Sequence, residues 1–245
     1  MIIGEKMIDT ILFDLDGTLL PLDMDNFMKA YFSTLAKKTA PLGYEPKSLI
    51  KGIWAGTEAM VRNDGSKTNE EAFWARFAEI FGEKVYSHMS TFDDYYENEF
   101  DSVINACEPT DRSAKIIKKL KERGFCVVLA TNPIFPSLAT KKRAKWAGLD
   151  LDDFALVTTY DNSGFCKPNP KYYEMILEKI GKRADQCLMV GNDATEDVAA
   201  KYAGIEVFLL TDHLINKENI DINEYENGGF DALEKYLDAL TSPKG

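Results

Sequence analysis

Residues 11–19 read Ile-Leu-Phe-Asp-Leu-Asp-Gly-Thr-Leu, an apolar run that ends in two carboxylates, a glycine and a threonine. The length and composition of the run are typical of a strand buried on both faces, and Gly17 is the residue at which the chain turns away. Side chains two positions apart on a strand point the same way, so Asp14 and Asp16 can converge on one small volume. Paired carboxylates in one place favour a bound cation. The stretch therefore predicts the catalytic end of a buried strand.

Composition limits the classes of protein that the chain can belong to. Of its 245 residues, 45% are hydrophobic and 28% are charged, so the chain can bury a core and hold one large domain or two small ones. The formal net charge of -11 argues against nucleic acid or an anionic membrane as the main partner, because both favour a basic surface. No apolar run approaches the roughly 18 residues of a membrane span, and residues 1–7 are too short and polar for a secretory signal. We expect a cytoplasmic protein.

Several other chemistries lack their sequence patterns. The four cysteines are widely spaced and form no C-x-x-C pair, which argues against a zinc site and a disulfide framework. His88 and His213 are the only histidines and have no recognisable partner in the sequence, so a histidine triad or metal cluster has little support. The glycine-rich motifs of serine hydrolases, P-loop NTPases and dinucleotide enzymes are absent from the sequence.

Residues 25–103 carry helical patterns without a convincing buried strand and predict a separate helical module. Two helices are expected at 25–38 and 47–62, and a third begins at the capping box Thr68-Asn69-Glu70-Glu71 and ends at Gly82. A fourth extends to about residue 100. The aromatic residues of this module recur at steps of three and four, so we expect them to be core packing rather than a ligand cage.

From residue 110 onward, helical and strand patterns alternate, which predicts a parallel sheet. Strands are expected at 8–15, 125–130, 154–159, 187–190 and 206–210. Helices are expected at 110–123, 137–146, 170–180, 195–202 and 231–240. The first strand belongs to the same sheet, so the helical module is an insertion between strand one and the rest. In an open α/β sheet, ligands bind outside the carboxyl ends of the strands.

Polar residues follow the other predicted strands at the same edge. Thr131 and Asn132 offer a hydroxyl, an amide and backbone N–H groups that can hold phosphate oxygens. Lys167 stands just before a predicted helix that begins at Pro170. Residues 191–197, Gly-Asn-Asp-Ala-Thr-Glu-Asp, place an amide and carboxylates at a turn between strand and helix. Each segment alone could be an ordinary turn, a solvated lysine or a helix cap, but together they supply what a phosphoryl group requires.

With the four segments in this order, the chain resembles the haloacid dehalogenase superfamily of phosphohydrolases over essentially its whole length. Asp14-Leu15-Asp16-Gly17-Thr18 matches the first motif of that family, Thr131 the second, Lys167 the third, and residues 191–197 the acidic fourth. The resemblance implies an α/β fold with a Rossmann-like, three-layer parallel-sheet core at residues 1–20 and 109–245. It also implies a mobile α-helical cap of the C1 type at residues 21–108, and such a cap permits a functional monomer.

The residue types suit the chemistry that the resemblance implies. Asp14 would attack phosphorus and form an aspartyl-phosphate, and Asp16 would protonate the leaving oxygen and then deprotonate the attacking water. A Mg²⁺ ion would screen the repulsion between carboxylate and phosphate. Lys167 and Thr131 would neutralise the remaining charge. The substrate phosphate would also contact residues of the first and second motifs, namely Gly17, Thr18 and Asn132.

The fourth motif departs from the family pattern at the expected metal site. Relatives commonly place an aspartate directly after the glycine, whereas this chain has Asn192 there and Asp193 next. Either Asp193 joins Asp14 and Asp16 as a ligand after a small shift of the turn, or the Asn192 carbonyl coordinates and Asp193 binds through water. We favour Asp193. Asp197 would orient Lys167 or a metal-bound water from behind.

We therefore predict a Mg²⁺-dependent phosphatase that acts on a small phosphorylated metabolite, with neither nucleic acid nor membrane as a partner. A sugar phosphomutase is the alternative within the same superfamily, since it uses the same four motifs and returns the phosphate to a second hydroxyl. A catalytically silent binding or regulatory protein is the alternative from another class, suggested by Asn192. Residues 20–24 and the helices beyond them are expected to select the substrate, and the polar loop 62–67 is either a contact for a second anionic or sugar group or a solvated turn.

Overall fold

A six-stranded, fully parallel sheet in the order β3-β2-β1-β4-β5-β6 organises residues 7–243, the part of the chain that the computed structural model describes. Residues 1–6 and 244–245, which were predicted to belong to the catalytic core, lie outside the described range. The strands are β1 Thr10–Phe13, β2 Cys126–Leu129, β3 Leu156–Val157, β4 Cys187–Gly191, β5 Glu206–Leu210 and β6 Glu226–Gly228. The expected α/β architecture with a parallel sheet is confirmed.

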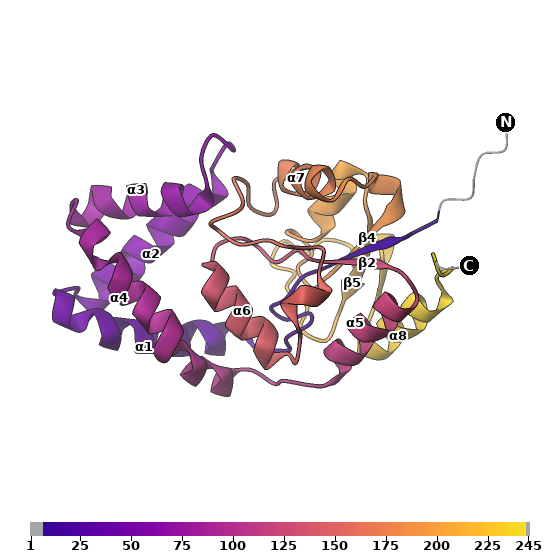
Figure 1. Ribbon diagram of the computed structural model, residues 1–245, viewed down its shortest axis with the longest axis horizontal. Helices are drawn as coiled ribbons and strands as arrows, with labels where there is room; N and C mark the ends of the chain where they lie inside the picture. The colour runs from indigo at the N-terminus through magenta and orange to yellow at the C-terminus, as the bar shows by residue number, and fades with distance from the viewer. Residues whose placement is uncertain (1–6, 244–245) are drawn as a thin grey trace.

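Helices cover both faces of the sheet, because successive side chains of the buried strand β1 point to opposite sides. Ile11 and Phe13 pack in one apolar cluster with helices α5, α6 and α8, while Leu12 packs in a second cluster with α7 and the short 3₁₀ helix η5. In Figure 1, α7 lies above the sheet, and α5 and α8 lie below it. These elements are α5 Arg112–Glu122, α6 Ser137–Trp146, α7 Pro170–Ile180, α8 Phe230–Ala239 and η5 Val198–Ala203.

The central position of β1 places the three segments that follow β1, β2 and β4 next to one another. Phe13 is in register with Leu129 on one side and with Val190 on the other. The pairing continues one residue further, since the N–H of Asp14 donates to the carbonyl of Val190 at 2.9 Å. The carboxyl ends of the three strands therefore meet at one edge, as open parallel sheets require for a ligand site.

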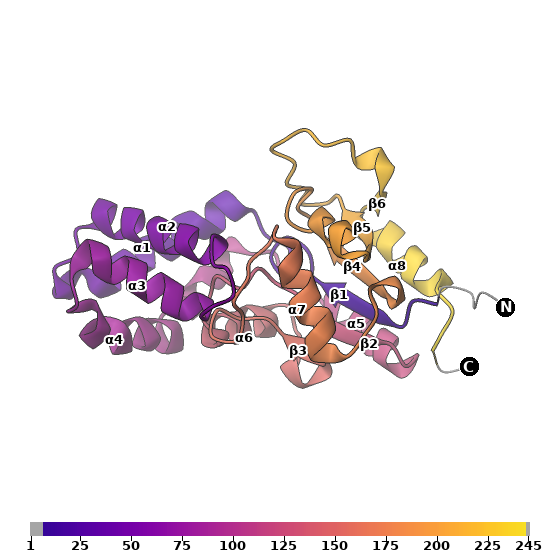
Figure 2. The same ribbon diagram turned by 90° about the horizontal axis from the view of Figure 1, so that it is seen from above.

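Of the five α-helices between β1 and β2, the first four form a bundle beyond this edge of the sheet (Figure 2). They are α1 Met24–Thr39, α2 Pro46–Val61, α3 Asn69–Phe81 and α4 Val85–Asn98. The predicted aromatic core is present: the ring of Phe77 lies 4.6 to 5.9 Å from the rings of neighbours that include Phe81, Trp74 and Phe92. The chain enters and leaves the bundle at adjacent points, where the N–H of Glu108 donates to the carbonyl of Pro21 at 2.8 Å.

The bundle also touches the core through the first residue of α3. Asn69 is fully buried, and its amide nitrogen donates to the carbonyls of Pro133 at 3.1 Å and Phe165 at 3.3 Å. Its side-chain oxygen accepts from Asn63 at 2.9 Å. Residues 62–67, the polar loop, pack beside this contact and do not line the cavity described below. A buried amide with these partners fixes one wall of the bundle against the loops that follow β2 and β3.

Two expectations about secondary structure were wrong. Residues 195–202 were expected to be a helix, but a turn precedes η5 because the Asp193 side chain accepts from the N–H groups of Thr195 and Glu196, at 2.8 Å each. Strand β6 was missed, since its three residues carry no apolar run. The predicted fourth helix ends at Asn98 and continues as the 3₁₀ segment η2, Phe100–Ala106. Within the described range, every helix is too short or too polar to cross a membrane.

The predicted capping box at α3 is present and can be tested directly. The Thr68 hydroxyl accepts from the N–H of Glu71, and the Glu71 carboxylate accepts from the N–H of Thr68 at 2.8 Å. Thr68→Ala should lower the free energy of unfolding by about 1 kcal/mol, because the N–H of Glu71 loses its acceptor. Urea unfolding measures this, and Thr68→Ser, which keeps the hydroxyl, is the control. Equal losses in the two variants would contradict the capping role.

Candidate active site

A buried lysine connects the carboxyl ends of β1 and β4. The ammonium of Lys167 donates to Asp14 Oδ1 at 2.8 Å and to Asp197 Oδ1 at 2.7 Å, and all three side chains are buried. Burial alone would lower the pKa of Lys167, but the two carboxylates outweigh it and raise that pKa well above its ordinary value. Lys167 is therefore a fixed positive charge at the edge of the sheet.

The surroundings of Asp14 compensate its negative charge only in part. Burial raises its pKa to about 7, the Lys167 ammonium opposes that rise, and the carboxylates of Asp197 and Asp16 add to it. The hydrogen bond from Lys167 goes to Oδ1. Asp14 lines the cavity, and within residues 7–243 no group donates a hydrogen bond to its Oδ2, so this oxygen is free to react.

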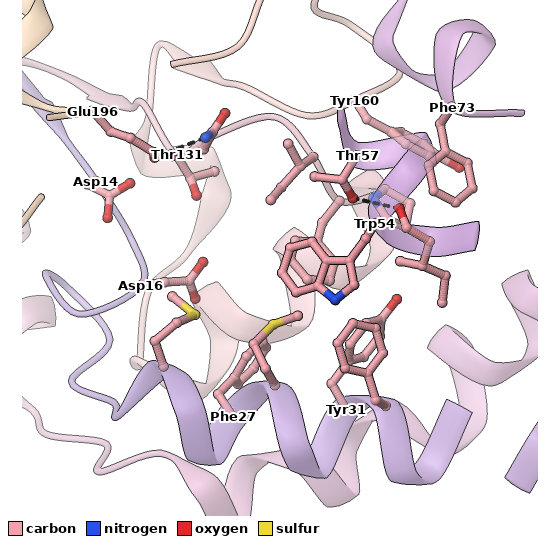
Figure 3. A pocket seen from close by; sticks show the side chains of 18 of the residues that line it. Asp14, Asp16, Phe27, Tyr31, Trp54, Thr57, Phe73, Thr131, Tyr160 and Glu196 are labelled. Atoms are coloured by element: carbon pink, nitrogen blue, oxygen red, sulfur yellow. Dashed lines mark hydrogen bonds between the residues drawn. The ribbon is translucent and has the colours of Figure 1, made fainter. Parts of the chain in front are cut away.

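The second strand end supplies Thr131 and Asn132, as predicted. The Thr131 backbone carbonyl accepts from Thr158 Oγ1 at 2.7 Å and from the Tyr172 hydroxyl at 2.9 Å, which fixes the residue while its side chain faces the cavity (Figure 3). Asn132 is engaged within the protein: its amide nitrogen donates to Glu196 at 2.9 Å and its oxygen accepts from the N–H of Lys167 at 3.3 Å. Asn132 thus joins the loops that carry Lys167 and Glu196.

Gly17 and Thr18 support Asn192 rather than line the cavity. The Thr18 hydroxyl donates to Asn192 Oδ1 at 3.0 Å, and Asn192 Nδ2 donates to the His213 carbonyl at 2.7 Å. Gly17 has a φ of +82°, and a Cβ there would lie 2.3 Å from Asn192 Nδ2. Only glycine combines that backbone conformation with so close an approach.

The carboxylates of Asp193 and Asp197 hold the turn of the fourth motif by accepting hydrogen bonds from its backbone N–H groups. The Asp193 side chain caps the turn through Oδ1, as described above, and its N–H donates to Asp197 Oδ2 at 2.9 Å. A Cβ at Gly191 would lie 2.1 Å from Asp197 Cγ, so the glycine lets Asp197 reach both Lys167 and this turn. Burial raises the pKa of Asp193 above its ordinary range. Asp197 therefore joins Lys167 to this turn at the edge of the cavity.

Glu196 lines the cavity and was not among the predicted site residues. Burial raises its pKa to about 8, the Lys167 ammonium opposes the rise, and the neighbouring aspartates reinforce it. The residue lies inside the quoted fourth motif, but a single glutamate in an acidic turn gives no signal of whether it faces solvent or a cavity.

Arg143 was also missed and is the partner of Asp16. Its guanidinium donates to Asp16 Oδ2, contacts the Thr140 hydroxyl at 3.3 Å and lies 4.4 Å from the centroid of the Phe135 ring. Arg143 is 1% exposed. The sequence carries no clear signal for it, because the apolar residues of α6 form no marked face, although Arg143 is buried there beside Ala139 and Ala144. A buried arginine requires an anionic partner.

The donor set suits a hard divalent cation, although no three His, Cys, Asp or Glu side chains in residues 7–243 are arranged as a complete metal cage. Mg²⁺ rarely uses such a cage, since it binds through one or two carboxylates, waters and substrate phosphate. Asp16 Oδ1 is buried without a hydrogen-bond partner. The edge carries Asp14, Asp16, Asp193, Glu196 and Asp197 with only Lys167 and Arg143, among the described residues, as paired cations. This excess of carboxyl groups over cations fits a bound divalent cation.

A cavity of about 250 Å³ opens from these carboxylates toward the helical bundle. Figure 3 shows Asp14 and Asp16 on one side of it and the rings of Phe27, Tyr31 and Trp54 beyond them. Phe27 and Tyr31 belong to the apolar core, as the helical spacing predicts, and they also line this cavity. Phe27 both packs against Phe100, with centroids 6.4 Å apart, and lines the cavity, while Trp54 is 51% exposed.

The fold and the acidic strand edge are those of a hydrolase of the haloacid dehalogenase type. Residues 8–204 match the family described as haloacid dehalogenase-like hydrolase, and the chain belongs to this family. It is 27% identical to a phosphoglycolate phosphatase of Pectobacterium atrosepticum over 93% of this chain and 89% of that protein. It is 25% identical to the pyrophosphatase PpaX of Halalkalibacterium halodurans over 81% of each chain. A solved HAD phosphatase from Thermococcus onnurineus has the same fold, with a TM-score of 0.60 and 20% identity over 96% of this chain and 100% of that one.

The buried pair of Arg143 and Asp16 should contribute strongly to stability as a unit. Arg143→Met leaves the Asp16 carboxylate, which is partly buried, without its partner and should cost about 3 kcal/mol of unfolding free energy. Combining it with Asp16→Asn should recover part of that loss, because the uncompensated charge is gone. Denaturant unfolding of the two single variants and the double variant measures the coupling. Additive losses would contradict a direct interaction.

Glu196 should make stability depend on pH. Between its ordinary pKa of 4.5 and its folded value of about 8, the folded protein holds a proton that the unfolded chain has lost. Glu196 therefore favours folding less and less as pH rises through this window. Glu196→Gln keeps an acceptor for Asn132 and removes this loss, so the variant should become increasingly more stable than wild type up to about pH 8. Thermal unfolding in metal-free buffer tests this, and a stability difference that is constant with pH would contradict it.

Proposed function

We propose that this protein is a Mg²⁺-dependent phosphatase that hydrolyses small phosphate monoesters through an aspartyl-phosphate on Asp14. The observation that carries the proposal is the buried Lys167, which holds Asp14 through one oxygen at the end of the central strand. The relatives named above as phosphatases support the same class of reaction.

Asp14 is the nucleophile in this proposal. Its Oδ2 attacks phosphorus, a new P–O bond forms, and the bond between phosphorus and the ester oxygen breaks. Lys167 and the Thr131 hydroxyl contact the non-bridging phosphate oxygens and neutralise charge there. Thr131 is suited to this role because Thr158 and Tyr172 fix its backbone while its side chain faces the cavity.

Asp16 is the proton carrier in both half-reactions. It gives a proton to the leaving ester oxygen, then takes one from the water that attacks the aspartyl-phosphate. Its Oδ2 is bound by Arg143, and its Oδ1 is buried without a partner. Arg143 is thus a positioning residue, because it sets the orientation of the oxygen that handles the proton.

Asp14 and Asp193 are the residues that would hold Mg²⁺ through their carboxylates, because the proton transfer proposed for Asp16 uses its one unpartnered oxygen. Asn192 is the weaker alternative to Asp193. Both polar atoms of the Asn192 side chain are committed to Thr18 and His213. When bound, Mg²⁺ supplies the positive charge that lets a carboxylate approach a phosphate dianion. Asp197 keeps Lys167 in place and accepts from the N–H of Asp193.

The inserted helices act as a cap in this proposal, with residues 21–108 as one unit and residues 1–20 and 109–245 as the catalytic core. The entry and exit of the insertion lie side by side, which suits a hinge. Residues of both units line the cavity, so closure of the cap over a bound substrate would limit the access of water to an aspartyl-phosphate.

Replacement of Asp14 by asparagine is the direct test. Asp14→Asn should reduce Mg²⁺-dependent phosphate release from p-nitrophenyl phosphate by a factor on the order of 10⁴ or more, because the nucleophile is lost. Asp152→Asn, at an exposed residue remote from the cavity, is the matched control. Retained activity in a folded Asp14→Asn protein would refute the proposal.

The metal assignment has its own test. Asp193→Asn keeps an oxygen for the turn but loses a charge, so the Mg²⁺ concentration for half-maximal activity should rise at least about tenfold. Asn192→Asp should instead cost about 1–3 kcal/mol of stability, because a carboxylate would face the His213 carbonyl that now accepts a hydrogen bond. Unchanged Mg²⁺ dependence in Asp193→Asn would show that this residue is not a ligand.

A further inference from the structure

The cavity wall opposite the carboxylates is apolar and aromatic, and this limits the leaving group that the site can accept. Phe27 and Tyr31 come from α1, Trp54 from α2 and Phe73 from α3, while Phe135 and Tyr160 come from loops of the core. In Figure 3, Phe27 and Trp54 lie nearest Asp16, and Tyr31, Phe73 and Tyr160 lie farther along the same cavity. A ligand group in this space exchanges water for ring faces.

Trp54 is the clearest sign that the wall has a function. Its indole is 51% exposed although it lines the cavity, and it contacts Phe32 edge to face with centroids 5.7 Å apart. An indole held in this way offers a flat apolar surface to a ligand.

Charge on the wall argues against a second anionic group on the substrate. Of the described residues that line the cavity, the only cation is Lys217, an exposed residue in the segment after β5 on the core side. The bundle side contributes an acid, Asp93, whose pKa is raised by burial. A carboxylate or second phosphoryl group directed at the bundle would lose its hydration without gaining a cation.

The hydroxyl groups of the wall are already used. The hydroxyls of Tyr31 and Tyr96 share a hydrogen bond of 2.8 Å, Thr57 donates to the Ile53 carbonyl at 3.0 Å, and Tyr160 donates to Glu70 at 3.3 Å. A polyhydroxylated leaving group would depend on the Asp93 carboxylate for most of its hydrogen bonds on this wall and would leave the ring faces unused, so the wall suits a flat apolar group better than a sugar.

We propose that the substrate is a phosphate monoester of a small, uncharged aromatic alcohol, whose ring occupies the aromatic wall while its phosphate meets Asp14. This inference rests on the proposed phosphatase function and adds the class of leaving group. A volume of about 250 Å³ lies below the roughly 300–1,000 Å³ of sites for drug-sized ligands, which suits a leaving group of about one ring.

The first experiment compares kcat/KM for matched esters in the presence of Mg²⁺. Phenyl phosphate should exceed 4-carboxyphenyl phosphate at least about tenfold, although the carboxylated phenol is the better leaving group, because its carboxylate meets no cation. Benzyl phosphate should exceed phosphoglycolate by a larger factor. Equal or faster turnover of the carboxylated member of either pair would overturn the inference and leave the phosphatase proposal intact.

A gain-of-function variant tests the wall itself. Thr57→Lys introduces a cation among the rings and should raise the ratio of kcat/KM for 4-carboxyphenyl phosphate over phenyl phosphate at least about tenfold, whereas Thr57→Met should not. Trp54→Ala should lower kcat/KM for phenyl phosphate more than for ethyl phosphate, and Tyr202→Ala, another exposed aromatic residue, is the control. An unchanged ratio in a folded Thr57→Lys protein would place the leaving group elsewhere.

Binding separates failure of this inference from failure of the proposed function. If no ester releases phosphate, the phosphatase proposal fails, and calorimetry with non-hydrolysable phosphonates still tests the wall. Benzylphosphonate should bind the Mg²⁺-loaded protein at least about tenfold more tightly than phosphonoacetate. Equal affinities, or tighter binding of phosphonoacetate, would refute the aromatic leaving group.

Discussion

The ion pairs of Lys167 with Asp14 and Asp197 are the constraint on which the rest of the site depends. Three buried charged groups are stable only if each has a partner at hydrogen-bond distance, so the loops that carry them must meet. Gly191 is required because any Cβ there would displace Asp197, and Asn132 ties the lysine loop to the turn after β4. The parallel sheet brings these loops to one edge, and the lysine then determines which oxygen of Asp14 faces the cavity.

Asp16 is also held by a buried cation, as Asp14 is, but this cation comes from a different part of the fold. Its partner Arg143 comes from α6, which packs on one face of the sheet, so the orientation of the proposed proton carrier depends on a helix outside the motifs. Phe135 lies under the guanidinium and at the same time lines the cavity. The leaving-group wall and the proton carrier therefore share a neighbour, and a substrate ring in the wall lies close to the group that would protonate its ester oxygen.

The sequence was sufficient for the architecture because its signals are local. The apolar run before Asp14, the alternation after residue 110 and the capping box at Thr68 each report a short stretch of chain, and each element is present. The polar strand β6 and the turn before η5 were not predictable in this way, since side chains such as Asp193 override helical periodicity there.

The predicted site residues were found by motif, and the structure brings Asp14, Thr131 and Lys167 to one edge. The sequence did not predict the contacts between distant segments, such as Arg143 with Asp16 and Asn192 with His213. It also did not predict that Glu196 faces the cavity rather than solvent. The aromatic residues of the bundle show the same limit, because helical spacing reports that a ring is buried but not whether a cavity lies beside it.

The central claim, that Asp14 forms a phospho-enzyme, is tested most directly by the stereochemical course at phosphorus. A phosphate ester made chiral with oxygen isotopes should be transferred with retention of configuration, because attack by Asp14 and then by water each invert the centre. Inversion would mean that water attacks the substrate directly and would contradict the account.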